Sequence, residues 1–286
     1  MKYFIINNFI NEKICKKLIN AANKKTDNDH ESKKNKTVIH GSRQFLSSTD
    51  IEFYNLLKNS KDWRNLVNKI NSEKFLNSCL ANFSLSEKKF SLVNFFKNKK
   101  LSTIQKKFKG ISSNIIRLIS TKNLLLYFLI RLYRDSIRKI KFSKIFYLNK
   151  SAVELLFDYS KAGNGYSREI HRDSDNRLIV FILYLNSPAK KDNYKGGNFD
   201  IYKLIKGNKN TSYPDKNNCK KIDSIKPHNG KLVVFLNNDN SFHGVQKMKN
   251  HSQLRHFIYG GFTLLNKKNP YINNSSKVAT EFHLYD

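Results

Sequence analysis

Two histidines and one aspartate form the most specific chemical pattern in this chain. His171 and Asp173 stand two residues apart in His171-Arg172-Asp173, and His243 follows after a long interval. In an extended strand, side chains two residues apart point to the same side, so this imidazole and this carboxylate would converge. Such a set suits a divalent metal ion. The pair taken alone also fits a strand-edge histidine beside a solvated aspartate, and that alternative stays open at this point.

The sequence around the pair forms an ordered series of features. An apolar segment ends in Tyr184-Leu185-Asn186, and a Gly196-Gly197 turn then leads into Phe199-Asp200-Ile201-Tyr202. Gly230 precedes the apolar segment 231–235, His243-Gly244-Val245 follows, and Arg255 lies twelve residues beyond His243. Two histidines and one carboxylate on a β-barrel form a facial triad, which holds ferrous iron and leaves three coordination positions open.

With this series the sequence resembles the 2-oxoglutarate- and iron(II)-dependent dioxygenases, in their prolyl-4-hydroxylase-like branch. The resemblance covers roughly residues 151–265. It implies a double-stranded β-helix, with His171, Asp173 and His243 as ligands of Fe(2+). It also implies 2-oxoglutarate and O2 as cosubstrates, with L-ascorbate as an optional further cofactor. The implied reaction hydroxylates a C–H bond and releases succinate and CO2.

The resemblance also implies roles for side chains around the metal. Arg255 is expected to pair with the distal carboxylate of 2-oxoglutarate, because a planar guanidinium can bind a carboxylate through two hydrogen bonds. A surface arginine is the alternative. Tyr184 and Tyr159 match tyrosines that hydrogen-bond the cosubstrate, although either could be a core aromatic residue with a bonded hydroxyl. Contacts with the substrate are expected from Tyr166, Arg172 and Asn186.

Two positions narrow the implied chemistry. Asp173 keeps the carboxylate that halogenating relatives replace, which favours hydroxylation. Phe257 stands two residues after Arg255, where a small or hydroxylated residue often assists the arginine. Because phenylalanine cannot donate a hydrogen bond, Arg255 would act with Tyr184 alone. The substrate is not identified, since a peptidyl, prolyl-like group and a small molecule both fit.

The elements that must position these residues divide the chain into three parts. Over 1–85 we expect a strand at 3–6 and helices at 11–22, 50–57 and 63–70, from apolar residues at helical spacing. Over 151–286, segments rich in β-branched and aromatic residues predict strands at 153–159, 178–185, 198–204, 231–236 and 254–264. Helices followed by a jelly roll make this an α+β chain.

Residues 86–150 differ in composition from both neighbours. They contain 17 lysines and arginines but two acidic residues, interleaved with apolar residues at helical spacing. We expect a basic helical insertion that packs on the core and helps to cover the entrance of the site. A helix on a membrane surface, or a surface for nucleic acid or another partner, are the alternatives.

Composition limits the remaining possibilities. The 286 residues include 53 basic and 22 acidic ones, a net charge of +31, which fits either a functional anion-binding surface or a merely solvated one. A second arginine typical of nucleic-acid demethylases is missing after Arg255, so nucleic acid is disfavoured. A demethylase and a non-catalytic binding barrel stay as alternatives. The longest apolar run, 124–130, is shorter than the ~18 residues of a membrane span.

The three cysteines, Cys15, Cys79 and Cys219, are far apart and odd in number, which argues against a disulfide framework. Free thiols are typical of a reducing compartment. We therefore expect a cytoplasmic protein, with peripheral membrane association as the alternative. The sequence does not predict the oligomeric state.

Overall fold

The computed structural model describes residues 1–26, 39–40, 43–48, 50–86, 90–93, 151–189, 193–208, 211–264 and 269–272. The chain divides into two compact units. Unit 1 contains residues 1–46, 157–262 and 268–286, and unit 2 contains residues 47–156 and 263–267. Nearly all of the predicted insertion at 86–150 lies outside the described residues, so its helices and the division of the chain at 85 and 150 stay predictions.

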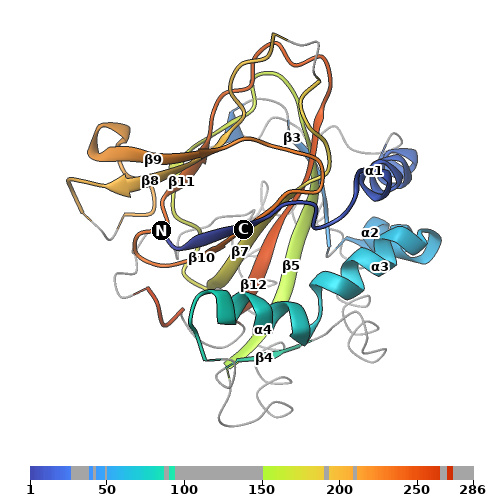
Figure 1. Cartoon of the computed structure of the whole chain (residues 1–286), viewed down its shortest axis with the longest axis horizontal. Helices are drawn as coiled ribbons and strands as arrows, with labels where there is room; N and C mark the ends of the chain where they lie inside the picture. The colour runs from blue at the N-terminus through green and yellow to red at the C-terminus, as the bar shows by residue number, and fades with distance from the viewer. Residues whose placement is uncertain are drawn as a thin grey trace, which may run out of the picture. The chain divides into compact units, whose positions relative to one another are not determined.

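Two sheets form the framework of unit 1 (Figure 1). The larger sheet has the order β1 (Tyr3–Ile6), β10 (Leu232–Leu236), β7 (Arg177–Tyr184), β12 (Arg255–Leu264), β5 (Ser151–Ala162) and β3 (Arg43–Ser47). The smaller sheet has the order β2 (Ile39–His40), β6 (Ser167–His171), β11 (His243–Val245), β8 (Phe199–Leu204) and β9 (Cys219–Ile225). Strands that are distant in sequence thus alternate within each sheet. This is the predicted jelly roll, and the fold class is confirmed.

The core of unit 1 lies between these two sheets. Every residue of β7 and of β10 is buried, as expected for continuous apolar strands that are covered on both faces. One cluster of buried side chains joins Tyr184 of β7 and Phe235 of β10 to Phe199 of β8. Because it draws on both sheets, this cluster fixes their spacing around the interior, where the site is built.

Helix α1 (Glu12–Thr26) covers part of unit 1. Asn11 caps its first turn, since its Oδ1 accepts a hydrogen bond of 2.9 Å from the Ile14 amide. Cys15, Leu18 and Ala22 are fully buried and recur every three or four residues, so they form the inner face of the helix. The helix ends four residues beyond the predicted boundary.

Unit 2 contains α2 (Ile51–Asn59), α3 (Lys61–Ile70), α4 (Glu73–Asn82) and β4 (Phe90–Leu92), which pairs in parallel with the first residues of β5. Ser60 and Ser72 cap α3 and α4 by accepting hydrogen bonds from backbone amides of the first turn. The sequence predicted α2 and α3 but not α4. It also did not predict the strands β2, β3, β4, β9 and β11.

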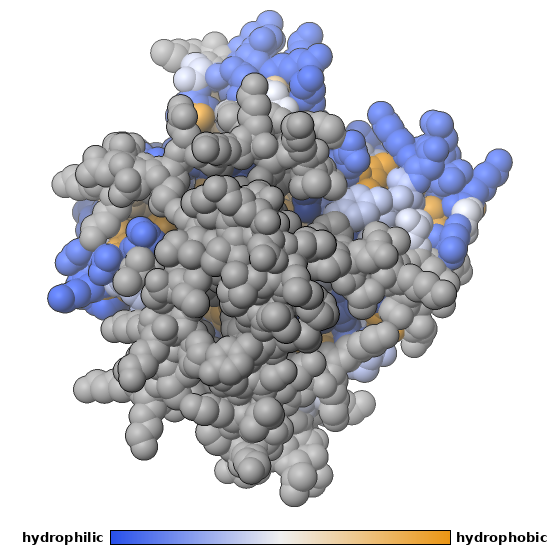
Figure 2. Space-filling model, turned by 180° about the vertical axis from the view of Figure 1, so that it is seen from behind, coloured by the Kyte–Doolittle hydropathy of each residue, from blue (hydrophilic) through white to orange (hydrophobic). Residues whose placement is uncertain are grey.

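Figure 2 shows one face of the molecule. Among the coloured residues that are visible there, hydrophilic ones predominate and apolar ones form small spots. The large apolar side chains that are exposed, such as Ile205 and Leu254, are common on protein surfaces when they stand singly. In the part of the chain that the structure describes, no helix has the length and apolar character needed to cross a bilayer.

Candidate metal centre

Strand pairing in the smaller sheet brings the two histidines together. His171 is the last residue of β6 and His243 is the first residue of β11, and the two are register partners in an antiparallel pair. Their ring centroids lie 4.3 Å apart. Partners across neighbouring strands are the closest side chains on a sheet face, so the register alone makes two residues that are distant in sequence into neighbours.

Asp173 completes the group from a loop. The sequence predicted that His171 and Asp173 share one extended strand, but β6 ends at His171. The carboxylate still returns to the histidines, with Oδ1 3.9 Å from His171 Nε2 and Oδ2 3.7 Å from His243 Nε2. One donor atom from each of the three residues lies within 4.8 Å of the others, and all three residues are buried.

Hydrogen bonds to the backbone fix the orientation of both imidazoles. His171 Nδ1 lies 2.9 Å from the Glu169 carbonyl oxygen, and His243 Nδ1 lies 2.9 Å from the Ser241 carbonyl oxygen. A carbonyl oxygen can only accept, so each neutral ring carries its hydrogen on Nδ1 and keeps the lone pair of Nε2. Both lone pairs are therefore available to a metal ion on the side of Asp173.

The environment sets the charges that metal binding requires. Burial lowers the pKa of His171 well below its ordinary value, and the nearby His243 lowers it further. Burial also lowers the pKa of His243. Burial by itself would raise the pKa of Asp173, but the charges of His243, Arg177 and His171 lower it to about 2. Near neutral pH the group thus consists of two neutral imidazoles and one carboxylate.

The unsatisfied atoms of this group fit a divalent metal ion. Asp173 Oδ2 and His243 Nε2 are buried and have no hydrogen-bond partner among the described residues. Buried acceptors without partners cost about 1–3 kcal/mol each, and a cation between them would satisfy both. Two imidazoles and one carboxylate with open positions are the donor set of ferrous iron sites. The residues present therefore fit Fe(2+).

Arg255 provides a second unsatisfied group on the interior face of β12. Arg255 is 5% exposed, and its Nη1 donates a hydrogen bond to the Gly197 carbonyl oxygen. Its Nη2 is buried and has no partner in the residues described. An unpaired N–H on a buried guanidinium fits a carboxylate, because a charged partner would satisfy its hydrogen-bonding capacity. This is the fit expected for the distal end of 2-oxoglutarate.

Two predicted tyrosines share the surroundings of Arg255. Tyr184 and Tyr166 belong to the interior cluster, and both interact electrostatically with Arg255. Burial raises the pKa of Tyr184, so its hydroxyl stays protonated and can donate a hydrogen bond. The ring of Phe257 lies 6.2 Å from that of Tyr166, within the same apolar wall. This wall keeps water away from the guanidinium.

The remaining predicted side chains are directed elsewhere. The Tyr159 hydroxyl bonds to His256 Nδ1 at 2.8 Å. Because His256 follows Arg255 directly, these two residues of β12 point to opposite faces of the sheet, and Tyr159 lies on the face away from Arg255. The structure therefore does not bring Tyr159 to the metal centre.

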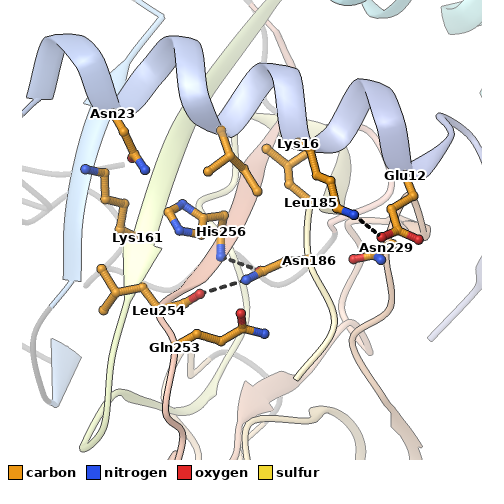
Figure 3. Close-up of a pocket in the computed structure, with 11 residues that line it drawn as sticks. Glu12, Lys16, Asn23, Lys161, Leu185, Asn186, Asn229, Gln253, Leu254 and His256 are labelled. Atoms are coloured by element: carbon orange, nitrogen blue, oxygen red, sulfur yellow. Dashed lines mark hydrogen bonds and ion pairs between the residues drawn. The ribbon is translucent and has the colours of Figure 1, made fainter. Parts of the chain in front are cut away.

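Arg172 and Asn186 are held in other contacts. The buried guanidinium of Arg172 pairs with Asp239 at 3.2 Å and Asp175 at 3.4 Å. The side-chain amide of Asn186 forms two hydrogen bonds to the backbone around Arg255. Its oxygen accepts from the backbone N–H of His256, and its nitrogen donates to the carbonyl oxygen of Leu254, both at 2.8 Å (Figure 3). Asn186 thus holds the backbone of the segment that carries Arg255. Neither the Arg172 side chain nor the Asn186 side chain points to the metal centre.

Tyr259 and Asn237 support the centre and were not predicted. The Tyr259 hydroxyl donates a hydrogen bond to Asp173 Oδ1. The Asn237 amide joins the two segments that carry Asp173 and His243, donating to the Ser174 carbonyl oxygen at 2.9 Å and accepting from the Ser241 hydroxyl at 2.8 Å. Tyr259 lies four residues after Arg255 on one strand, so counting by twos would have placed it on the same face.

Comparison with protein families gives one match. Residues 156–262 match the model described as the 2OG-Fe(II) oxygenase superfamily, a range that contains the three metal-ligand candidates and Arg255. This match confirms the resemblance that the sequence indicated. Among curated proteins, none matches the chain.

Solved structures that match the chain include several prolyl hydroxylases. A Pseudomonas putida prolyl-4-hydroxylase is 15% identical with a TM-score of 0.40, covering 92% of this chain and 92% of its own. A Trichoplax adhaerens prolyl hydroxylase, solved with a hypoxia inducible factor peptide fragment, is 12% identical with a TM-score of 0.40 and coverages of 91% and 83%. A viral collagen prolyl hydroxylase from Paramecium Bursaria Chlorella virus-1 is 13% identical with a TM-score of 0.39 and coverages of 92% and 96%.

Proposed function

We propose that this chain is a 2-oxoglutarate- and iron(II)-dependent dioxygenase that hydroxylates an unactivated C–H bond. The observation that carries the proposal is the buried group of His171, Asp173 and His243, in which Asp173 Oδ2 and His243 Nε2 have no hydrogen-bond partner among the described residues. When bound, ferrous iron and 2-oxoglutarate activate O2, so that one oxygen atom oxidises the substrate and the other enters succinate, with release of CO2.

The residues of the chain divide the remaining work. His171, Asp173 and His243 would hold the metal through three donor atoms, which leaves three positions for the cosubstrate and O2. Arg255 would pair with the distal carboxylate of 2-oxoglutarate through Nη2, and the Tyr184 hydroxyl would donate to the same end. The apolar cluster around Tyr184 would exclude water, which strengthens these charge interactions.

Tyr259 would keep the carboxylate ligand in one mode. Because its hydroxyl donates to Asp173 Oδ1, only Oδ2 of that carboxylate stays free for the metal. A carboxylate bound through both oxygens would fill one further position and compete with O2. Tyr259 would thus be a positioning residue, because its bond to Asp173 Oδ1 would leave one coordination position of the metal available to O2.

For the substrate we favour a peptidyl, prolyl-like group over a small molecule. The support is the motif series of the prolyl-4-hydroxylase-like branch in this sequence, together with the carboxylate at Asp173, which favours hydroxylation over halogenation. Among the predicted substrate contacts, Tyr166 belongs to the interior cluster that contains Tyr184. L-ascorbate and a cytoplasmic location belong to the proposal on the same sequence grounds.

The test measures succinate release by the full chain with Fe(2+), 2-oxoglutarate, O2 and ascorbate. Proline-containing peptide pools and small-molecule pools are added separately and searched by mass spectrometry for products that have gained one oxygen atom. We expect turnover in the native chain, loss of turnover in Asp173→Ala, and native turnover in His228→Ala, a variant of an exposed histidine in a turn. Succinate release that survives Asp173→Ala would refute the proposal.

A further inference from the structure

Arg172 stands between two of the metal-ligand candidates, His171 and Asp173, and its side chain is fully buried. Its guanidinium forms ion pairs with two loops. Nη2 lies 3.4 Å from Asp175 Oδ1 in the loop after β6, and Nη1 lies 3.2 Å from Asp239 Oδ1 in the loop before β11. One buried cation thus joins the loop that carries Asp173 to the loop that leads into β11.

The loop before β11 is a turn that leads to His243. The Ser241 amide donates to the Asn238 carbonyl oxygen at 3.0 Å, and the Asn238 amide donates to the Ser241 hydroxyl at 3.2 Å. The Ser241 carbonyl oxygen lies 2.9 Å from His243 Nδ1 and orients that imidazole. Because Asp239 lies inside this turn, its ion pair ties the turn, and with it His243, to Arg172.

The loop after β6 also contains a turn, because the Arg177 amide donates to the Ser174 carbonyl oxygen at 3.0 Å. This turn starts directly after Asp173, and Asp175 lies within it. The ion pair between Asp175 and Arg172 therefore limits the movement of the segment that places the carboxylate of the metal centre.

The backbone of Arg172 holds a third loop. Its amide donates to the carbonyl oxygen of Ser212, a buried residue, at 2.8 Å. The next residue, Tyr213, stacks on His171, with ring centroids 5.9 Å apart and an angle of 17° between the ring planes. Through its side chain and its backbone, Arg172 thus contacts a loop beside each of the three metal-ligand candidates.

An arginine suits this position because its planar guanidinium stays charged and presents N–H groups in more than one direction. Asp175 and Asp239 both contact this one guanidinium, and their side chains are only 13% and 15% exposed. Without the cation between them, two partly buried carboxylates would repel each other and drive the loops apart. Lysine would keep the charge but present it at a single point.

We propose that Arg172 is a positioning residue of the metal centre. It holds the loops of Asp173 and His243 at the separation at which one ion can contact both side chains, and it does so without touching the ion. This inference rests on the proposed function, because it takes His171, Asp173 and His243 as the ligands of one metal ion.

Mn2+ titration of the full chain by calorimetry, with electron paramagnetic resonance of the bound ion, tests the proposal. Arg172→Lys should weaken Mn2+ binding about tenfold to hundredfold, as is common when a residue that orients a metal ligand is changed. The resonance spectrum should also change, because the ligands take another arrangement, whereas lower stability alone would leave the spectrum of the folded protein native. Arg64→Lys is the matched control, since Arg64 is an exposed residue of unit 2 that donates to backbone carbonyl oxygens. Native affinity and a native spectrum in Arg172→Lys would overturn the proposal.

Asp239→Asn is a second variant, which removes one partner and leaves Arg172 paired with Asp175. It should weaken Mn2+ binding about tenfold, whereas Asp62→Asn in helix α3 should not. The losses of Arg172→Lys and Asp239→Asn should not add in the double variant, because both act through one ion pair. Fully additive losses would contradict the proposal. Thermal unfolding checks that each variant is folded, and Asp239→Asn carries the test if Arg172→Lys does not fold.

Asp173→Ala distinguishes failure of this inference from failure of the proposed function. If the native chain binds Mn2+ and Asp173→Ala does not, then native affinity in both Arg172→Lys and Asp239→Asn would overturn the positioning role alone. Absence of Mn2+ binding by the native chain, or unchanged binding in Asp173→Ala, would overturn both.

Discussion

Replacing Tyr259 by phenylalanine removes one hydroxyl and tests how the metal centre is organised. The hydroxyl donates to Asp173 Oδ1, and the side chain of Asp173 is 1% exposed. A hydrogen bond to a buried charged group contributes about 1.5–3 kcal/mol. At 1.36 kcal/mol per pKa unit, its loss should raise the pKa of Asp173 by about one to two units. From about 2, the pKa of this carboxyl stays far below neutral.

In Tyr259→Phe we therefore expect the Asp173 carboxylate to keep its charge but to lose its fixed orientation. Asp173 stays ionised at pH 7, but its Oδ1 becomes free to move toward the metal and to compete for the position that O2 requires. Loss of a residue that orients a metal ligand commonly weakens binding or activity about tenfold to hundredfold. We expect 2-oxoglutarate turnover to fall within that range, while one metal ion still binds per chain.

The measurement combines succinate release with Mn2+ titration by calorimetry. Tyr202→Phe is the matched control, because Tyr202 also donates to a carboxylate, Asp200 Oδ2 at 3.2 Å, and neither residue is a metal-ligand candidate. Turnover and Mn2+ affinity should be native in this control. Native turnover in Tyr259→Phe would refute the positioning role. Loss of metal binding without a change in the unfolding temperature would show that the phenol does more than orient Asp173.

Two further predictions concern Arg255 and His256. In Gly197→Ala the added Cβ would lie 2.0 Å from Arg255 Nη2, so the KM for 2-oxoglutarate should rise about tenfold or more. Gly207→Ala has a similarly positive φ, but its added Cβ would lie 3.3 Å from the Asn218 side chain and away from Arg255, so this variant should keep the native KM. Equal effects of both variants would mean that backbone strain is the cause. The pKa of His256 in the folded chain is about 4, below the ordinary 6.5. Between pH 4 and 6.5 the unfolded chain therefore binds more protons at this residue than the folded chain does. As a result, the free energy of unfolding falls as the pH is lowered from 6.5 to 4. In urea unfolding, the decrease in the free energy of unfolding over this pH range should be smaller by about 2 kcal/mol in His256→Gln than in the native chain, and unchanged in His228→Gln. The same pH dependence in the native chain and both variants would contradict this prediction.

The structure brings together the three residues that the sequence singled out, His171, Asp173 and His243. Their residue types and their order in the chain pointed to them, because two imidazoles and one carboxylate are the donor set of a ferrous iron site. The central strands β7 and β10 were also predictable, since a continuous apolar run indicates a strand that is buried on both faces.

Side-chain direction was harder to predict. In β5 nearly every residue is buried on one face or the other, so no alternation of polar and apolar residues indicated that Tyr159 points toward His256. Strands β6 and β11 are short, and their pairing places His243 beside His171 through contacts that are distant in sequence. Asp173 lies in the loop after β6, so the alternation of side chains along a strand does not predict where its carboxylate points.

Metal binding by the native chain and by His243→Ala tests the central claim most directly. Iron bound after anaerobic dialysis against Fe(2+) is counted per chain, with His228→Ala as a control that loses an exposed histidine. We predict one iron per chain in the native protein and in the control, and at least a tenfold weaker affinity in His243→Ala. Unchanged iron binding in His243→Ala would contradict the account, because His171, Asp173 and His243 would then not share one ion.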